Sequence, residues 1–324
     1  MIVVTGASGH VGANLVRMLL GRGEAVRAVV HRSAPSLDGL ELERVQGDIL
    51  EEGSLRAAFE GADTVFHLAA LISITGSQGG AVERMNVQGA RNAARAARQA
   101  GVRRYVHVSS VHAWAHAPEE PLSEVCKRAG LGCPAYDQSK AAGEVEVRAE
   151  IEEGLAAVIV NPSGVIGPQD FGPSRFGQTL VQMARGRMPA LVDGGFDWVD
   201  ARDVCTSMLA AAERGRIGES YLLGGRWASV AEIATLVAGL TNRSPPRLTT
   251  PRWLASWSAP LAEHAQRAFG MEPLFTPEGL HALFHGSRHV DWSKAATELG
   301  HTPRPLADTL ADTLGWFRAR GVLS

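Results

Sequence analysis

The first twelve residues constrain the fold more than any other part of the chain. An apolar run at residues 2–5 is followed at once by Gly6, Gly9 and Gly12, and a helical pattern begins at His10. In a strand–turn–helix unit, the first glycine permits a tight turn, the second lets the backbone approach a pyrophosphate, and the third lets the helix pack on the strand. The N–H groups that open the helix favour phosphate oxygens. The pattern therefore predicts a dinucleotide-binding unit.

Short apolar segments alternate with helical patterns throughout the first half of the chain. We expect strands at residues 2–5, 26–31, 64–68, 104–109 and 157–161, and helices at about 10–20, 54–59, 82–100 and 136–151. This alternation predicts βαβ units and a parallel sheet. The run 158–160 is apolar at every position, which is typical of strands covered on both faces. The predicted fold class is α/β, a doubly wound parallel sheet (Rossmann fold) with a smaller, mostly helical C-terminal part.

The composition changes after about residue 165. Glycine, proline and aromatic residues are concentrated at 167–177 and 194–198, and a proline-rich connector at 244–251 leads into further helical patterns. We expect residues 1–165 to form the dinucleotide-binding domain, with 199–224 returning to it. Residues 166–198 and 225–324 would then form the substrate-binding part.

Charge and cysteine content disfavour several classes of protein. The 324 residues carry 32 Lys and Arg against 34 Asp and Glu, a balance that does not favour nucleic acid or an acidic membrane surface as partner. Three cysteines without C-x-x-C spacing argue against a disulfide framework, although Cys126 could bridge Cys133. No H-E-x-x-H pattern suggests a metal site. The chain has no apolar stretch of about 18 residues and no basic signal-peptide region, so we expect a cytoplasmic protein without a membrane span.

The end of the second strand indicates which dinucleotide is bound. Many NAD sites place an acidic residue there, roughly 20 residues after the glycine turn, where it holds the ribose 2′-hydroxyl. This chain has His31 and Arg32 instead. A guanidinium suits a 2′-phosphate through bidentate, charge-assisted hydrogen bonds. We expect NADP(H) to be preferred and NAD(H) to be the alternative; the other interpretation is a solvated strand end.

Tyr136 and Lys140 lie four residues apart on a predicted helix, and therefore on one face of it. A free phenol titrates near pH 10, and a nearby ammonium favours the phenolate and lowers that pKa. Such a phenol can give a proton to a carbonyl oxygen as hydride arrives, or remove one from an alcohol. Ser109 and Ser110 end a predicted strand at the same edge of the sheet, where a hydroxyl could hold the substrate oxygen.

These motifs resemble the extended short-chain dehydrogenase/reductase family, also called the NAD-dependent epimerase/dehydratase family. Besides the glycine turn, the serine pair and the Tyr–Lys pair, the matching segments are 47–49, 67–70, 86, 161–168, 200–203 and, less strongly, 291–300. The segment 26–32 is most similar to the dihydroflavonol-reductase-like and 3β-hydroxysteroid-dehydrogenase-like branch. The stretches 186–190, 215–218 and 223–225 also resemble bacterial hopanoid-associated sugar epimerases.

The resemblance implies a role for each matched residue. Ser110 would orient the carbonyl, Tyr136 would be the acid/base, and Lys140 would hold the nicotinamide ribose and tune the phenol. Together with Tyr136 and Lys140, the cofactor would contact Gly6, Ser8, Gly9, His10, Val11, Gly12, His31, Arg32, Asp48, Ile49, Leu68, Ala69, Ala70, Pro162 and Val165. Residues 48–49 would flank the adenine, 69–70 the pyrophosphate and ribose, and 162–165 the nicotinamide. The chain departs from many relatives at 113–115, which read Ala-Trp-Ala rather than valine-tyrosine-glycine, and at His10, where an aromatic or apolar residue is usual.

Several residues have two interpretations. His112, two residues after Ser110, is a second acid/base or, as we favour, a loop residue that lines the pocket. The helices at 82–100 and 136–151 form a homodimer interface or face the sheet. Arginines of the second half bind a nucleotide diphosphate or, as we favour slightly, lie on the solvated surface: Arg175, Arg185, Arg187 and Arg226. Four aromatic residues line an apolar substrate cavity, form a second core, or do both: Phe171, Phe176, Phe196 and Trp198.

The sequence favours an NADP(H)-dependent oxidoreductase that reduces a carbonyl, or oxidises the alcohol, of a mid-sized, largely apolar or aromatic small molecule. The alternative is a nucleotide-sugar epimerase that retains NAD. A sugar 4,6-dehydratase is less favoured, because Val111 and His112 stand where such relatives need acidic residues. A non-catalytic cofactor-binding regulator is disfavoured because the chain keeps the Tyr–Lys pair. The absence of a G-x-S-x-G motif argues against a hydrolase.

Overall fold

The central element of the computed structural model is a seven-stranded parallel sheet in the order β10-β6-β5-β4-β1-β2-β3. The structure describes residues 1–31, 33–188, 190–246, 248–268 and 276–323. The strands are β1 (Ile2–Thr5), β2 (Val26–Val30), β3 (Glu43–Gln46), β4 (Thr64–His67), β5 (Arg104–Val108), β6 (Ala157–Pro162) and β10 (Ser220–Leu223). The strand order reverses between β1 and β4, the kind of position where such sheets bind ligands. The predicted α/β doubly wound fold is confirmed.

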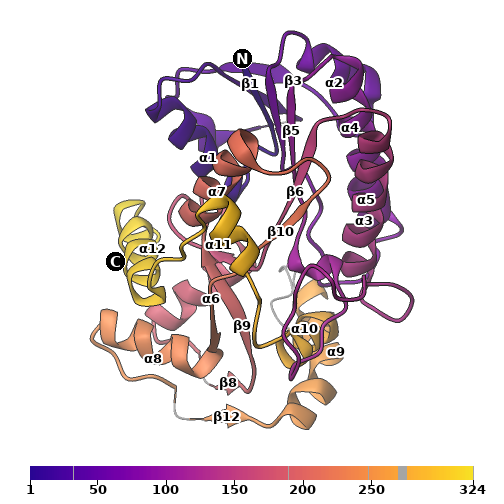
Figure 1. The fold of residues 1–324 in the computed structure, drawn as a ribbon. Coiled ribbons are helices and arrows are strands. Elements are labelled where there is room, and N and C mark those ends of the chain that lie inside the picture. Colours follow the sequence, from indigo (N-terminus) through magenta and orange to yellow (C-terminus); the bar gives the residue numbers. More distant parts are fainter. Residues whose placement is uncertain (32, 189, 247, 269–275, 324) are drawn as a thin grey trace.

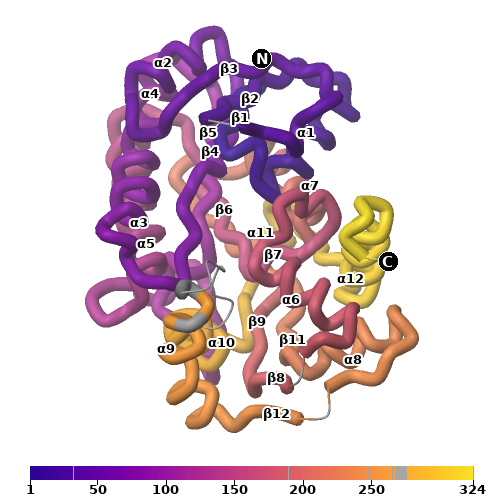
Figure 2. The backbone as a smooth tube through the Cα atoms, turned by 180° about the vertical axis from the view of Figure 1, so that it is seen from behind, coloured from indigo at the N-terminus to yellow at the C-terminus, as the bar shows by residue number. Residues whose placement is uncertain are grey.

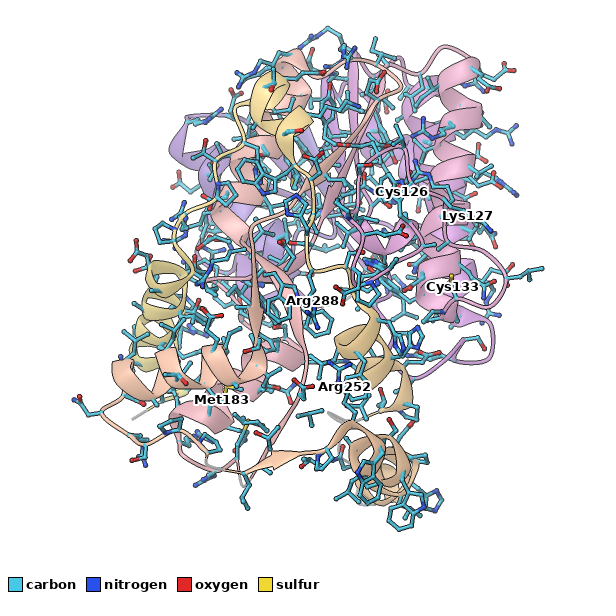
Figure 3. The ribbon with its side chains drawn as sticks, turned by 60° about the horizontal axis from the view of Figure 1, so that its bottom comes forward. Cys126, Lys127, Cys133, Met183, Arg252 and Arg288 are labelled. Atoms are coloured by element: carbon cyan, nitrogen blue, oxygen red, sulfur yellow. The ribbon has the colours of Figure 1, made fainter. Side chains whose placement is uncertain are left out.

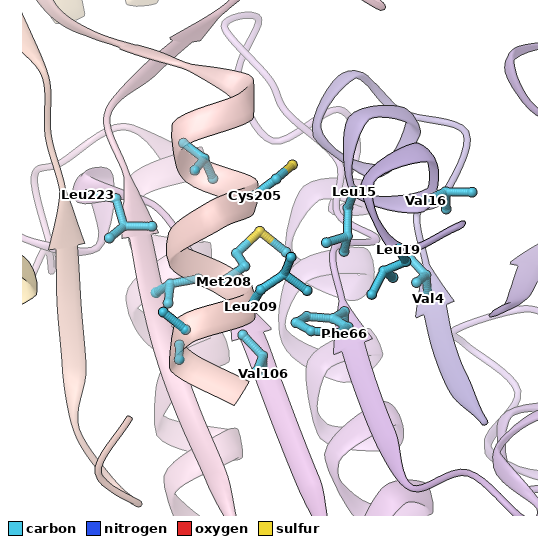
Figure 4. Packing of buried hydrophobic residues seen from close by; sticks show 14 of the residues in the cluster. Val4, Leu15, Val16, Leu19, Phe66, Val106, Cys205, Met208, Leu209 and Leu223 are labelled. Atoms are coloured by element: carbon cyan, nitrogen blue, oxygen red, sulfur yellow. The ribbon is translucent and has the colours of Figure 1, made fainter. Parts of the chain in front are cut away.

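Helices cover both faces of this sheet, as the opposite views in Figure 1 and Figure 2 show. One face carries α1 (His10–Gly21), α7 (Ala201–Arg214) and α11 (Ser293–Leu299), and the other carries α2 (Glu52–Phe59), α4 (Gly89–Gln99) and α5 (Ala135–Glu152). Alternate residues of each strand point to opposite faces of the sheet. A strand that is covered on both sides therefore contributes side chains to a hydrophobic core on each side. Val4 and Phe66 pack toward Leu15 and Met208 (Figure 4), while their neighbours Val3 and Val65 lie in the second core. This arrangement accounts for strands that are apolar at every position.

The predicted strands and helices of the first half end within one or two residues of those observed, with two differences. The edge strand β3 has a polar, mostly exposed sequence that did not predict a strand. The helix expected at 82–100 is composite: α3 (Ala81–Glu83) continues through a π-helical turn (Arg84–Gln88) into α4. The π turn contains the buried Asn86. Its side-chain amide accepts from the Leu71 N–H at 2.7 Å and donates to the Ser139 hydroxyl at 2.9 Å, and so joins this helix to α5.

Residues that follow β6 build a second, smaller core. A three-stranded sheet has the order β11-β9-β7, formed by β7 (Gly164–Ile166), β9 (Gly195–Asp200) and β11 (Arg226–Ser229), and β8 (Leu191–Val192) pairs with β12 (Thr249–Thr250). The surrounding helices are α6 (Arg175–Ala184), α8 (Val230–Leu240), α9 (Arg252–Ala268), α10 (Pro277–His285) and α12 (Leu306–Ala319). In Figure 1, α6 and α8 to α10 occupy the lower half of the molecule. This part is mostly helical, as expected; the division into domains stays a prediction.

Three of the four aromatic residues singled out in the sequence belong to this second core. Phe176 stacks on Trp198 with ring centroids 3.9 Å apart, and Phe196 meets the same indole edge-on at 5.4 Å. Phe171 lies at the border of this core: its ring meets that of Trp316 edge-on at 5.2 Å, and the guanidinium groups of Arg17 and Arg320 lie 4.7 and 5.1 Å from its centroid. The second core therefore accounts for three of these aromatic residues.

The three cysteines are all free, so the bridge considered between Cys126 and Cys133 is not formed. Figure 3 shows these two residues at separate places along the loop that precedes α5. Among the described residues, no helix combines the length and the apolar character that crossing a bilayer requires.

Candidate active site

The glycine turn after β1 and the end of β4 lie against each other. Gly6 has a φ of +67°, and a Cβ on it would lie 2.7 Å from the backbone nitrogen of Ala69. A Cβ on Gly12 would lie 2.2 Å from the carbonyl oxygen of Gly6. The Leu68 N–H donates to the Thr5 carbonyl at 3.2 Å. The structure thus brings the predicted cofactor residues of 6–12 and 68–70 to one place in the sheet.

The start of α1 fits a pyrophosphate. Gly9 precedes the helix, no side chain caps it, and its first turn has no acidic residue. A Cβ on Gly9 would meet only the Gly6 carbonyl oxygen within 4 Å, at 3.3 Å, so the space beside this backbone is otherwise open. The first N–H groups of a helix have no partner within the helix, and an anion can accept from them. Ser8, Gly9 and Val11 are therefore placed where the sequence predicted phosphate contacts.

The His10 ring contacts the segment that follows β7. Its Nε2 lies 3.1 Å from the Gly167 carbonyl and 3.0 Å from the Pro168 carbonyl. Asn14, one turn later, donates to the same Pro168 carbonyl at 2.9 Å. The imidazole therefore ties α1 to the segment after β7, and a contact of His10 with the cofactor stays a prediction.

We expect the adenosine end of the cofactor to occupy a depression of ≈ 440 Å³ at the edge of the sheet. It is lined by His31, Gln46, Gly47, Asp48, Glu51 and Ser54. The exposed His31 ring lies 3.3 Å from an Asp48 carboxylate oxygen. The side chain of Ile49 is buried in the core beside Gly89, and its predicted contact with the adenine stays a prediction. Arg32 lies outside the described residues.

Tyr136 and Lys140 lie on one face of α5, as predicted. The Lys140 side chain is only 4% exposed, and its ammonium donates to the Val108 carbonyl at 3.1 Å. Burial lowers the pKa of Lys140 to about 8, and the nearby Glu144 opposes this shift. Burial raises the pKa of Tyr136 to about 12; a hydrogen bond with the Ser110 hydroxyl lowers it, and the charge of Asp137 raises it further. The lowered phenol pKa that the sequence predicted from the Lys–Tyr pair is therefore wrong in this structure, because the effect of burial is larger.

Ser110 is the member of the serine pair that lies beside the phenol. It opens a short 3₁₀ turn (Val111–Ala113), and its hydroxyl accepts from the His112 N–H at 3.2 Å. The hydroxyl of the neighbouring Ser109 is buried without a hydrogen-bond partner among the described residues. Ser110, Tyr136 and Lys140 are thus brought together at the carboxyl end of β5, where a hydroxyl and a phenol can both reach one substrate oxygen.

A buried carboxylate that our sequence reasoning missed holds this arrangement in place. Glu144 has 2% of its side chain exposed and lies 2.8 Å from Arg128. The Asn161 amide donates to Glu144 at 2.6 Å and to the Ser110 carbonyl at 3.0 Å. Glu144 follows Lys140 by the same four residues that separate Lys140 from Tyr136, and this spacing could have identified it.

Trp114, at which the chain departs from many members of the family, lies in the same cluster as Arg128 and Glu144. The Arg128 guanidinium lies 3.9 Å from the centroid of the Trp114 ring, and a β-bridge joins the two residues. The bridge closes the loop between β5 and α5, and Leu122 within that loop pairs with Val290 of the C-terminal segment. Trp114 therefore covers the buried ion pair between Arg128 and Glu144.

His112 lies between this loop and the first turn of α5. Its Nδ1 is 3.1 Å from an Asp137 carboxylate oxygen, and its ring meets the Tyr136 ring edge-on with centroids 5.8 Å apart. Two of the four arginines considered for a nucleotide diphosphate are bound within the protein: Arg185 donates to the Val322 carbonyl at 2.8 Å, and Arg226 pairs with Glu232.

The model of the "NAD dependent epimerase/dehydratase family" matches residues 2–224. This span includes the glycine turn, Ser110, Tyr136 and Lys140, and it ends just after β10.

Two curated relatives match almost the whole chain. "Sterol demethylase protein B" of Methylococcus capsulatus is 39% identical over 337 residues, covering 99% of this chain and 99% of the relative. "Putative dihydroflavonol 4-reductase" of Synechocystis sp. is 36% identical over 330 residues, covering 98% and 94%. Among solved structures, PA4631, described as a nucleoside-diphosphate-sugar epimerase from Pseudomonas aeruginosa, is 27% identical with a TM-score of 0.78, covering 100% of this chain and 99% of that one.

Removal of the buried carboxylate tests its structural role. We expect Glu144→Ala to lower the free energy of unfolding by about 3–5 kcal/mol, because it leaves the Arg128 charge without its partner. The matched control is Glu146→Ala on the same helix, which removes an exposed ion pair with Arg91 at 2.6 Å and should cost less than about 1 kcal/mol. Urea denaturation of the two variants measures the difference. Equal losses would show that Glu144 does not have this role.

Proposed function

Since the chain belongs to the NAD-dependent epimerase/dehydratase family and is an NAD(P)-dependent oxidoreductase of the extended short-chain type, we propose that it is a carbonyl reductase that prefers NADP(H). Its substrate is a mid-sized, largely apolar or aromatic ketone, or the corresponding alcohol in the reverse direction. The observation that carries the proposal is the Ser110 hydroxyl, hydrogen-bonded to the Tyr136 phenol, with Lys140 one helical turn further along α5.

The substrate class is inferred from the relatives. A sterol is a largely apolar polycyclic molecule, and a dihydroflavonol is an aromatic one; both words occur in the names of relatives that match this chain from end to end. The shared chemistry is an oxygen on a ring carbon that can be a ketone or an alcohol. We therefore assign the same class of substrate to this protein.

The cofactor is held at the switch point of the sheet. The N–H groups that open α1 bind the pyrophosphate, Ala69 and Ala70 lie beside it, and the depression that contains His31 and Asp48 takes the adenosine end. The nicotinamide ring of the bound cofactor supplies or accepts the hydride. With the cofactor bound, Lys140 would hold the adjoining ribose, and Pro162 and Val165 would flank the ring.

Three side chains handle the substrate oxygen. In the reducing direction, the Ser110 hydroxyl donates a hydrogen bond to the carbonyl oxygen and holds it beside the phenol. Tyr136 gives its proton to that oxygen as negative charge develops there. The resulting phenolate is stabilised by the Lys140 ammonium on the same helical face, because a positive charge favours the ionised phenol. A protonated Tyr136 is the form required at the start, and burial favours it.

The preference for NADP(H) rests on the end of β2. His31 and Arg32 stand where an acidic residue would bind the 2′-hydroxyl of NAD. A guanidinium and an imidazole favour a 2′-phosphate, which a carboxylate at the same position would repel.

A nucleotide-sugar epimerase with retained NAD is the second candidate. It is favoured by the solved epimerase structure that covers the whole chain, and the same Tyr–Lys pair serves its transient hydride transfer. In that reaction the cofactor and the proton on Tyr136 are both regenerated within one turnover, so no net reductant is consumed.

The cofactor bound by the purified protein distinguishes the two candidates. We expect an empty site that binds NADPH more tightly than NADH, together with NADPH oxidation by members of a panel of apolar and aromatic ketones. Denaturation of the untreated protein, identification of any released nucleotide, and titration of the stripped protein measure this. Stoichiometric NAD and epimerisation of nucleotide sugars, with no ketone reduced, would contradict the reductase proposal.

Removal of the Tyr136 hydroxyl tests whether this residue is the acid/base. We expect Tyr136→Phe to lower the ketone reduction rate by roughly 10²–10⁴, the range that general acid–base catalysis contributes. NADPH affinity should change little, because the ring and Lys140 remain. Steady-state kinetics and a fluorescence titration of NADPH measure the two quantities. A variant with near wild-type turnover would exclude Tyr136 from this role.

The pKa of Lys140 predicts a pH dependence. Burial lowers that pKa to about 8, so the ammonium is present below pH 8 and is lost as the pH rises through this value. We expect the rate of ketone reduction at saturating NADPH to decrease above about pH 8, because the phenolate then forms without its cation. The Lys140→Met variant should be slower at all pH values and should lack this decrease. A wild-type rate that stays constant from pH 7 to 9.5 would contradict the assignment.

A further inference from the structure

His112 and Asp137 form a pair that the roles assigned above leave unused. The Asp137 carboxylate lies 3.1 Å from Nδ1 of the imidazole, so Nε2 faces the opposite direction. No hydrogen bond joins this Nε2 to any residue within the described part of the chain. The His112 side chain is 26% exposed, whereas Lys140 is almost completely buried. His112 therefore reaches solvent while its ring contacts the ring of Tyr136.

The backbone fixes the position of this imidazole. His112 lies in the 3₁₀ turn that begins at Ser110, and its N–H donates to the Ser110 hydroxyl. Asp137 directly follows Tyr136 in the first turn of α5. The two members of the pair are thus each attached to a residue that handles the substrate oxygen.

Ketone reduction consumes one proton from solvent in every turnover, and this proton must reach Tyr136. We propose that His112, which lies beside Asp137, is the residue through which Tyr136 recovers its proton from solvent. The proposal rests on the reductase function given above. The sequence left two interpretations of His112 open, and the proposal adopts the one in which His112 takes part in proton transfer.

The proposed step balances in atoms and charge. After Tyr136 has protonated the substrate oxygen, the N–H bond at Nε2 of the His112 imidazolium breaks, and its proton forms the O–H bond of Tyr136, directly or through one water molecule. The imidazole is then neutral and takes a proton from solvent at Nε2. The Asp137 carboxylate lies 3.1 Å from Nδ1, on the other side of the ring, so Nε2 is the nitrogen that exchanges the proton.

The charges around His112 support this choice. From α5 it faces Asp137 and Tyr136, from its own loop His116 at a centroid distance of 5.1 Å, and from α10 His281, which interacts with both Asp137 and His116. Burial, followed by the charge of His112, lowers the pKa of His116 to about 4. His116 is therefore neutral at physiological pH and cannot deliver the proton in place of His112.

The test separates the first turnover from the following ones. The first ketone reduced by the enzyme–NADPH complex takes the proton that Tyr136 already carries. We expect His112→Ala to keep the wild-type rate in this first turnover and to lose roughly tenfold or more in the steady state, where the phenolate must be protonated again. Stopped-flow measurement of NADPH oxidation records both phases with the ketone that the wild type reduces fastest.

Two further measurements separate proton return from a structural effect. Added imidazole should restore the steady-state rate of His112→Ala, because it can carry a proton in the vacated space. His112→Gln keeps a polar side chain beside Asp137 but cannot carry a proton, so it should show the same loss without rescue. The matched control His285→Gln changes an exposed histidine of α10 and should behave like the wild type.

The outcomes are distinct. An unchanged steady-state rate in His112→Ala, an equal loss in both phases, or the absence of rescue by imidazole would each overturn the proposal while the reductase function stands. A wild type that reduces no ketone but epimerises nucleotide sugars would overturn the proposed function, and the proposal with it, because that reaction takes no proton from solvent.

Discussion

The buried carboxylate of Glu144 is the point at which α5, β6 and the loop after β5 are joined. An ionised group in this position is stable only when cations and hydrogen-bond donors surround it, and Arg128 and Asn161 provide them. Asn161 also holds the Ser110 backbone, so this one carboxylate fixes the serine relative to the helix that carries Tyr136 and Lys140. Groups that are held before the substrate arrives need no reorganisation when charge develops on its oxygen. The geometry of the site therefore depends on an interaction that never touches the substrate.

The sheet could be predicted where burial determines the sequence. The strand β6 is covered by helices on both faces, and this leaves a continuous apolar run at residues 157–160. The edge strand β3 is covered much less, so its polar residues resemble those of a loop. The π turn at Arg84–Gln88 could not be predicted for a different reason. It changes the hydrogen-bond pattern of a helix without changing the alanine-rich composition that predicted the helix.

The site could be predicted to the extent that local spacing defines it. Tyr136 and Lys140 lie on one helix, so a separation of four residues is sufficient to place them together. The contact of Ser110 with the phenol requires the conformation of the loop from 109 to 134, which is set by Trp114 on Arg128 and by the pairing of Leu122 with Val290. These contacts join positions far apart in the sequence, and no spacing rule describes them. For His10, the glycine motif predicted the position at the start of α1. The direction of its ring, however, depends on a contact with Gly167 and Pro168, which lie far along the chain.

Asp137 and Glu144, two carboxylates of α5, act at different places in the site. Asp137 and Glu144 are separated by seven residues, about two helical turns, so they lie on the same side of the helix with Lys140 between them. Glu144 is paired with Arg128 and lies near the buried ammonium, whereas Asp137 lies beside an imidazole that solvent can reach. A phenol between a buried cation and an accessible imidazole suits a reaction that takes up one proton in each cycle. An epimerase returns the proton to its own substrate and has no use for such an imidazole, so this pair supports the reductase of the two functions that the fold can host.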